Sequence, residues 1–320
     1  MEKLILYCKS YSGDIERVKK LKNSIEKYNK DNIPFYVSCP QKDIKLFKDT
    51  LGTENYTLVA DEEIITFDKN KKYKGWTNTL VGYDKKGNIV EKSDFHIDGW
   101  RSQQIVKSNI HKLNITENYL CLDSDCYFIR DFFISDFMAT EDTPYTIIHE
   151  NKEIQQYSRL FFDKKFRGGS YNKALDAYRE IFGSPYKKLY DYGPNPYLWS
   201  CKVWKHLEDE YLTPNNYTFE SFNRTVEANY NIAMREAIVY GEYILNTRII
   251  DIIPTGPFFK VYHWIEMVDF EEKNNLFDLK KLEESYLGVI HQSNIERLDG
   301  KDKALLNHIR NTQNGHKKTI

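Results

Sequence analysis

The first sixty residues alternate short apolar runs with amphipathic helical patterns, and this alternation constrains the fold more than any other feature. Residues 3–8 (KLILYC), 34–40 (PFYVSCP) and 56–60 (YTLVA) have the length and the β-branched or aromatic content of strands. Between the first two runs, apolar residues recur at helical spacing: Ile15, Val18, Leu21, Ile25 and Tyr28. A second helical stretch separates the second and third runs. This β-α-β-α-β order predicts a parallel sheet covered by helices.

Composition limits the classes of protein to consider. The chain has 320 residues, 41% of them hydrophobic, which is enough for a large folded core, and its net charge of -1 gives no global field for nucleic acid. The opening apolar run of about five residues is shorter than a signal-peptide core of about 7–15 or a membrane span of about 20. We therefore expect a cytoplasmic protein whose five cysteines, without a CxxC pair, are reduced and hold no zinc or redox centre.

Two carboxylates follow a further strand pattern. Residues 62–98 are charged and irregular, which indicates a hairpin or an insertion, and residues 99–113 (GWRSQQIVKSNIHKL) predict a helix. The apolar run 119–122 (YLCL) then predicts a strand that ends directly before Asp123 and Asp125. Open α/β sheets bind ligands at the carboxyl ends of their strands, so the two aspartates are candidates for a ligand site.

The later part of the chain has a different texture. Residues 190–200 (YDYGPNPYLWS) are aromatic and rich in turn formers, and residues 226–248 predict one long helix. Strands are predicted at 249–254, in VYHW (261–264) and in VIHQS (289–293). Because no linker or repeat divides the chain, we expect one continuous domain with two lobes.

The Asp-Ser-Asp sequence has two interpretations. Asp-x-Asp occurs in ordinary turns, where an aspartate bonds its own backbone. Two carboxylates crowded against a core repel each other, however, unless a cation or hydrogen-bond donors compensate them. Hard oxygen ligands suit Mg²⁺ or Mn²⁺, which fill their remaining positions with water and substrate phosphates. The position after YLCL therefore favours a metal that neutralises a diphosphate.

Other uses of paired aspartates fit less well. An EF-hand loop that began at Asp123 would need glycine where the sequence has Phe128, which excludes that class of calcium site. Aspartyl-phosphate phosphatases carry the pair after their first strand, whereas here it follows a later one. Hydrolysis by two carboxylates stays open, although glycosidase carboxylates lie about 5–10 Å apart across a sugar and are seldom on one turn.

Three segments in this order carry a resemblance: SYSGDIERVKKLKNSI, GWRSQQIVK and LDSDCYF. Together with the preceding β-α-β-α-β pattern they resemble GT-A glycosyltransferases, in particular bacterial members of capsule and lipopolysaccharide biosynthesis. The resemblance covers residues 1–135, with PYLWS and EAIVYGEY as weaker matches further on. It implies a Rossmann-like α/β fold with a mostly parallel central sheet flanked by helices. It also implies a nucleotide-sugar-binding half at 1–135 and an acceptor-binding half at 136–320 of the same domain.

The same resemblance implies an activity. A nucleotide-sugar donor, expected to be a UDP-sugar, is bound with Mn²⁺ or Mg²⁺ on its diphosphate, and the sugar moves to a hydroxyl of a glycan or lipid-linked glycan. Asp125 matches the aspartate that binds the metal directly, and Asp123 matches the one nearer the ribose and the metal waters. The loop after the first strand (Ser10, Tyr11 and Asp14) falls where such enzymes hold the base and ribose. Asp14 is equally suited to be a helix N-cap.

Further residues are candidates with a plain structural alternative. Gln103, Gln104 and Lys107 share a helix, and Lys107 can reach a phosphate or a sugar hydroxyl or else remain a solvated lysine. His263 and His291 are candidates for completing the metal shell, although a histidine in a strand is more often hydrogen-bonded within the fold. Sequence alone leaves both alternatives open.

Glu236, Tyr240 and Tyr243 are spaced so that they share one helix face, where an acceptor sugar could stack and a carboxylate could take its proton. The alternative is a partly solvated helix surface. If transfer inverts the anomeric centre, Glu236 is the candidate base; if transfer retains it, Glu236 orients the acceptor. A metal-dependent phosphodiesterase or nucleotidyltransferase is a second interpretation. A non-catalytic carbohydrate-binding protein, suggested by 24 Tyr and 18 Phe, is a third. The basic tail 307–318 suggests peripheral contact with an anionic membrane.

Overall fold

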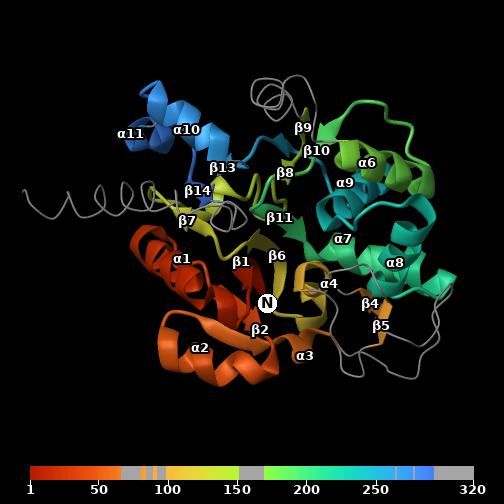
Figure 1. Ribbon diagram of the computed structural model, residues 1–320, viewed down its shortest axis with the longest axis horizontal. Coiled ribbons are helices and arrows are strands. Elements are labelled where there is room, and N and C mark those ends of the chain that lie inside the picture. The colour runs from red at the N-terminus through yellow and green to blue at the C-terminus, as the bar shows by residue number, and fades with distance from the viewer. Residues whose placement is uncertain are drawn as a thin grey trace, which may run out of the picture.

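The centre of the molecule is a five-stranded sheet of order β11-β6-β1-β2-β3 (Figure 1). The computed structural model describes residues 1–65, 81–83, 89–91, 99–150, 169–263, 265–276 and 278–291. The strands of this sheet are β1 (Glu2–Lys9), β2 (Phe35–Cys39), β3 (Thr57–Ala60), β6 (Thr116–Leu122) and β11 (Tyr197–Ser200). β1 is parallel to β2 and β6, β2 is parallel to β3, and only β11 runs antiparallel to its neighbour. The predicted mostly parallel sheet is confirmed.

The alternation of side chains along β1 divides the core into two layers. Ile5 and Tyr7 belong to one buried cluster, and Leu4, Leu6 and Cys8 belong to the other. Because both faces of the sheet are covered, its strands are apolar along their whole length rather than at every second residue. This explains why KLILYC appears in the sequence as a continuous apolar run.

Helices cover both faces of this sheet. In Figure 1, α1 and α2 lie on one side of the central strands, and α4, α7, α8 and α9 lie on the other. The helices are α1 (Ile15–Tyr28), α2 (Ile44–Leu51), α3 (Asp61–Ile64), α4 (Gly99–Ser108), α6 (Gly169–Phe182), α7 (Cys201–His206), α8 (Phe219–Tyr230), α9 (Glu236–Thr247), α10 (Ile265–Lys273) and α11 (Leu279–Ser285). The chain also forms the short helical segments η1 (Ser12–Asp14), η3 (Ile110–Leu113) and the π-helix η5 (Leu207–Leu212).

A second, three-stranded sheet has the order β13-β14-β7. It joins β7 (Cys126–Phe128) to β13 (Phe259–Tyr262) and β14 (Gly288–His291), so the two predicted returning strands are present. Both sheets therefore combine strands from before and after residue 135. The described residues also form three two-stranded sheets: β4 (Val81–Tyr83) with β5 (Ile89–Glu91), β8 (Thr146–Ile147) with β12 (Pro254–Thr255), and β9 (His149–Glu150) with β10 (Tyr190–Asp191).

Two predicted elements differ from the structure. The strand predicted at 249–254 is reduced to Pro254–Thr255. The helix predicted at 226–248 is broken, because Asn231 takes a left-handed conformation with φ 50° and ends α8. Glu227 Oε1 then accepts the backbone N–H of Met234 at 2.7 Å, and a new helix, α9, begins at Glu236. Glu236 therefore stands at a helix N-terminus rather than in a helix interior.

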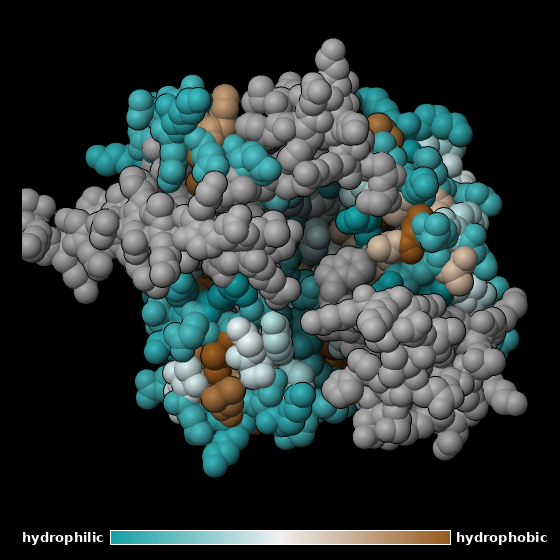
Figure 2. Space-filling model, in the orientation of Figure 1, coloured by the Kyte–Doolittle hydropathy of each residue, from teal (hydrophilic) through white to brown (hydrophobic). Residues whose placement is uncertain are grey.

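The surface seen in Figure 2 is mainly hydrophilic where it is described, and it is hollowed near the middle of this face, over the region of β11 in Figure 1. All five cysteines are buried, and none of them forms a disulfide. Among the helices of the described residues, none combines the length and apolar character needed to cross a membrane.

Candidate active site

The two aspartates lie on a tight turn between the two sheets. β6 ends at Leu122, and Cys126 donates its backbone N–H to the carbonyl of Asp123 at 3.1 Å, which closes the turn before β7 begins. We call residues 123–126 the aspartate turn. It lies at the carboxyl end of a parallel strand that is flanked by β1, as the sequence predicted. The Asp123 side chain is 28% exposed, so one face of this turn is open to solvent.

Lys107 provides the nearest charge. It lies on α4, is 1% exposed, and places Nζ 2.5 Å from Asp123 Oδ1. Burial by itself lowers the pKa of a lysine, but here the charge of Asp123 and other negative neighbours outweigh burial, and the Lys107 pKa is raised well above its usual value. The sequence alternative of a solvated lysine does not hold, because the ammonium group is buried and ion-paired at the edge of the sheet.

Glu236 adds a buried carboxylate to this region. It is 7% exposed, and its backbone N–H donates to Gln104 Oε1 at 3.3 Å, which ties α9 to α4. Burial raises the pKa of Glu236 to about 7, against the opposing charge of Lys107 and with a smaller contribution from Asp123. Glu236, Lys107 and Asp123 thus interact electrically, and we call them the site cluster. Gln103, the neighbour of Gln104 on α4, is half-buried.

Asn195 is a residue of this site that the sequence did not single out. It precedes β11 in the stretch GPNP, and the register that pairs Tyr197 with Cys121 carries it opposite Asp123. Its Oδ1 accepts the backbone N–H of Asp123 at 3.0 Å. The local signal was an asparagine between two prolines ahead of a strand, but nothing in that stretch names a partner 72 residues away.

The loop after β1 lies at the same edge of the sheet. Ser10 is buried, whereas Tyr11 is 44% exposed, with its ring over Gly13. The Asp14 carboxylate pairs with Arg17 on the following turn and makes no N-cap hydrogen bond. Of the three predicted base and ribose contacts in this loop, Tyr11 is the one with an open aromatic surface.

A buried ion pair adjoins this loop and was not predicted. Lys9 Nζ, at the end of β1, lies 2.9 Å from Asp61 Oδ2 at the start of α3. Burial raises the pKa of Asp61, and the nearby Lys9 opposes that effect. The sequence alone did not predict this ion pair, because Lys9 ends β1 and Asp61 follows β3, and β2 lies between these two strands in the sheet.

The strand register of the second sheet places the two predicted histidines at the same end of that sheet as the aspartate turn. Ile290 pairs with Cys126 across β14 and β7, so the next positions along these antiparallel strands are His291 and Asp125. β13 runs parallel to β14 and pairs Tyr262 with His291, which brings His263 to the same end of the sheet. The side chain of His291 lies outside the described residues, and that of His263 is half-buried.

The two predicted acceptor tyrosines belong to the core. Tyr240 and Tyr243 are each 4% exposed, and the Tyr240 hydroxyl accepts the backbone N–H of Ser200 at 2.9 Å. Tyr243 bonds the imidazole of His206 at 2.7 Å through its hydroxyl. The helical spacing correctly placed them on one face of α9, but that face packs against β11 and α7 and offers a sugar no ring to stack on.

The donor chemistry of the aspartate turn fits a hard divalent cation. Two carboxylates lie two positions apart on one turn, and the strand register adds a histidine position beside them. Over the side chains that the structure describes, no three His, Cys, Asp or Glu gather as a metal-binding group.

The chain belongs to a family of unknown function, DUF6492, whose model matches residues 4–266. No curated protein sequence matches it.

Similar solved structures include the galactosyltransferase LgtC in complex with donor and acceptor sugar analogues, with a TM-score of 0.45 at 10% identity over 90% of this chain and 87% of that chain. The bifunctional glycosyltransferase WbbM gives 0.45 at 10% identity, over 91% of this chain and 46% of that chain. Mouse xyloside xylosyltransferase 1 gives 0.44 at 8% identity over 92% and 98% of the two chains. Scores and identities this low do not assign a function.

Proposed function

We propose that this protein is a nucleotide-sugar-dependent glycosyltransferase with a divalent metal at the aspartate turn. The observation that carries the proposal is the site cluster. It comprises a buried ammonium on Asp123 and a buried carboxylate with a pKa of about 7, beside an Asp-Ser-Asp turn at the carboxyl edge of a parallel sheet. Transfer from a nucleotide sugar needs positive charge on the departing diphosphate and, if it inverts the anomeric centre, a base for the incoming hydroxyl; Lys107 and Glu236 are our candidates for these two roles.

The donor is proposed to lie along the carboxyl edge of β1 and β6. The exposed ring of Tyr11 is suited to stack on the base, and the loop at Ser10 to bond the ribose. Asp123 and Asp125, with His291 or His263, would hold Mn²⁺ or Mg²⁺, which when bound supplies charge neutralisation at the diphosphate. Lys107 would add a second positive charge next to Asp123 without any change of its own protonation, since its pKa is raised.

Glu236 is proposed as the general base. Ordinary glutamates are too weak as bases near neutrality, but burial raises the pKa of Glu236 to about 7, where it can take a proton from a hydroxyl. Its place at the N-terminus of α9, tied to Gln104, fixes its backbone next to Lys107. In a retaining enzyme the same carboxylate would orient the acceptor instead.

The proposed acceptor is a glycan or a lipid-linked glycan of a cell-surface polysaccharide. This context rests on the likeness of the segments SYSGDIERVKKLKNSI, GWRSQQIVK and LDSDCYF to capsule and lipopolysaccharide enzymes. A cytoplasmic enzyme that meets the membrane through its basic tail would suit such an acceptor. Residues 307–318 of that tail lie outside the described residues.

A ligand-binding experiment tests the proposal. UDP together with Mn²⁺ should stabilise the fold by about 2.7 kcal/mol at a hundredfold excess over Kd, which should exceed the sum of the effects of the two alone. Thermal unfolding of wild type and Asp125→Ala, each with UDP, Mn²⁺, both or neither, measures this synergy. Loss of synergy in Asp125→Ala is the expected result, and equal synergy in both proteins would locate the metal elsewhere.

Product analysis separates the alternatives. With a panel of nucleotide sugars, a transferase releases the nucleoside diphosphate only when an acceptor is present. Metal-dependent cleavage of the diphosphate bond without an acceptor would instead identify a phosphodiesterase or nucleotidyltransferase. Sugar binding that is indifferent to nucleotide and metal would identify a carbohydrate-binding protein.

A further inference from the structure

Asn195 makes a set of contacts that span the aspartate turn. Its Oδ1 accepts two hydrogen bonds, from the backbone N–H of Asp123 at 3.0 Å and from Cys126 Sγ at 3.1 Å. Its Nδ2 donates to the carbonyl of Cys121 at 3.1 Å. One amide therefore bonds the next-to-last residue of β6 (Cys121), the first aspartate of the turn (Asp123) and the first residue of β7 (Cys126).

These partners fix the orientation of the amide. Reversing oxygen and nitrogen would set the NH₂ group against the N–H of Asp123 and the oxygen against the carbonyl of Cys121, which loses both bonds to the backbone. The side chain is 3% exposed, so water does not replace them. The turn is thus held by a group with the correct donor and acceptor on each side.

The loop that carries Asn195 is itself anchored from the second half of the chain. Next to it, Gly193 donates its N–H to Asp191 Oδ1 at 3.0 Å and accepts from His149 Nε2 at 2.6 Å through its carbonyl. The Tyr192 hydroxyl donates to Glu242 Oε1 at 2.5 Å, and Arg179 Nε lies 2.9 Å from the same atom. Asn195 is therefore the end of a braced loop rather than a mobile side chain.

We propose that Asn195 is the positioning residue of the aspartate turn, which sets the directions of the Asp123 and Asp125 carboxylates. This inference rests on the proposed function where it concerns the cation and the diphosphate. Without the amide, the N–H of Asp123 loses its buried acceptor and the turn can rotate, so both carboxylates leave the geometry that a cation needs. Asn195 touches no reacting atom in this role and acts through the turn.

The control is Asn223, a buried asparagine of the same kind in α8. It is 0% exposed, accepts from the Tyr178 hydroxyl at 2.7 Å and donates to the Phe219 carbonyl at 2.7 Å. Asn223→Ala therefore removes a buried amide with two hydrogen bonds, to α6 and within α8 rather than to the aspartate turn, and it controls for loss of stability alone.

The first measurement uses metal-free wild type and hydrogen exchange. The amide hydrogen of Asp123 should exchange as slowly as those within β6, because it is bonded to Asn195. In Asn195→Ala it should exchange at least about tenfold faster, whereas Asn223→Ala leaves it unchanged. Fast exchange of Asp123 in wild type would overturn the proposal without any variant, even if Asn195→Ala does not fold.

The second measurement is the affinity for Mn²⁺ in the presence of UDP. Asn195→Ala should lower it by about tenfold or more, with Asn223→Ala within about twofold of wild type at a comparable loss of melting temperature. Equal affinity in the two variants would overturn the proposal. If wild type itself fails to bind UDP with Mn²⁺, the proposed function fails, and the exchange of Asp123 still decides whether Asn195 holds the turn.

Discussion

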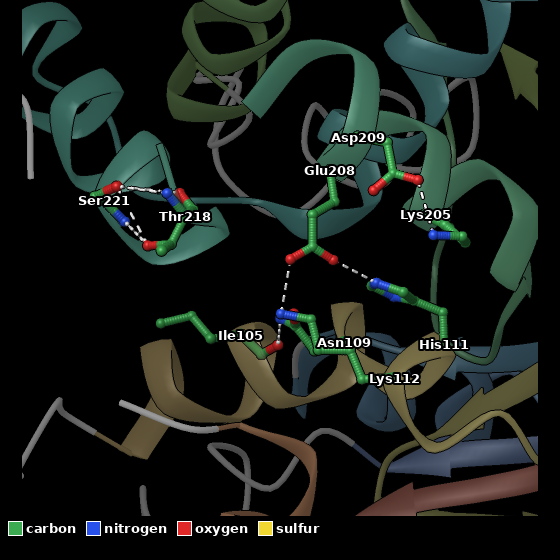
Figure 3. Close-up of polar contacts among 9 residues, drawn as sticks. All are labelled: Ile105, Asn109, His111, Lys112, Lys205, Glu208, Asp209, Thr218 and Ser221. Atoms are coloured by element: carbon green, nitrogen blue, oxygen red, sulfur yellow. Dashed lines mark hydrogen bonds and ion pairs between the residues drawn. The ribbon is translucent and has the colours of Figure 1, made fainter. Parts of the chain in front are cut away.

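Two charged clusters arise from one continuous stretch of chain and have opposite characters. Lys107, at the end of α4, enters the site cluster with Asp123 and Glu236. One turn further on, His111 and Lys112 of η3 meet Glu208 of the π-helix η5, at 2.7 and 2.9 Å (Figure 3). We call His111, Lys112 and Glu208 the η5 cluster. The close-up shows one oxygen of the Glu208 carboxylate directed toward His111 and the other toward Lys112.

The two glutamates differ in pKa for a clear physical reason. Glu236 is 7% exposed, and burial outweighs the opposing charge of Lys107, so its pKa rises to about 7. Burial also acts on Glu208, but the hydrogen bonds and charges of His111 and Lys112 prevail there, and its pKa falls to about 2. A carboxylate held by hydrogen bonds and a neighbouring positive charge is fixed as an anion, whereas one held by burial can exchange a proton near neutral pH.

The largest expected effect is that of Glu236→Gln on turnover. If Glu236 is the base, its loss should reduce acceptor-dependent turnover at least about a hundredfold while UDP and Mn²⁺ still bind. Glu208→Gln, the matched change in the η5 cluster, should leave turnover near that of wild type. Near-normal turnover in a folded Glu236→Gln protein would remove the base assignment and favour a retaining mechanism.

The pH dependence of the unfolding free energy should also depend on Glu236. Glu236 has a folded pKa of about 7, above its usual 4.5, so its favourable contribution is complete below pH 4.5 and is lost as pH rises through 7. Glutamine mimics the protonated form at every pH. The unfolding free energy of Glu236→Gln should therefore exceed that of wild type above pH 7, by up to about 3 kcal/mol, and match it near pH 4. Urea unfolding at both pH values measures this, and a constant difference would contradict the raised pKa.

Lys107 links the two parts of the site cluster, and its removal should have an intermediate effect. The charge of Lys107 lowers the pKa of Glu236, so Lys107→Met should move that pKa further up. The pH at which turnover reaches half its maximum should rise by about one unit, with turnover at pH 7 reduced about tenfold. A pH profile of kcat for wild type and variant tests this. An unchanged midpoint with lower kcat would mean that Lys107 acts only on the diphosphate.

Sequence predicted the parts of this site that depend on local pattern. Short apolar runs placed β1 and β6 correctly, and with them the aspartates, because a strand end fixes where the next residues emerge. The break between α8 and α9 was missed, since apolar spacing continues through it while Asn231 alone turns the backbone. Asn195 was missed for a different reason, because its partners are between 69 and 74 residues distant and only the register of β11 brings them together.

The burial of Tyr240 shows the limit of face arguments. Helical spacing predicts which residues share a helix face but not what covers that face. Here Trp199 and Trp204 pack on the Tyr240 ring, with ring centroids 5.7 and 5.3 Å away. The same spacing that suggested an acceptor surface is equally typical of a buried helix. Glu236 differs from the two tyrosines in its position, because it is the first residue of α9 and directly follows a loop, whereas Tyr240 and Tyr243 lie inside the helix.

The smallest expected effect concerns the η5 cluster. Glu208 is 33% exposed, so solvent screens its ion pairs, and Glu208→Gln should cost at most about 1 kcal/mol of unfolding free energy at pH 7. Its folded pKa of about 2 lies below the usual 4.5, so the stabilisation is present above pH 4.5 and is lost as pH falls toward 2. The stability that Glu208→Gln loses relative to wild type should therefore shrink in acid. The stability that Glu236→Gln gains also shrinks there, so the two differences have opposite signs at pH 8 and both become small at pH 3. Unfolding of both pairs of proteins at pH 3 and pH 8 compares them directly. If Glu236→Gln and Glu208→Gln changed the unfolding free energy in the same direction at pH 8, the contrast between a carboxylate fixed by its hydrogen-bond partners and one held by burial would be wrong.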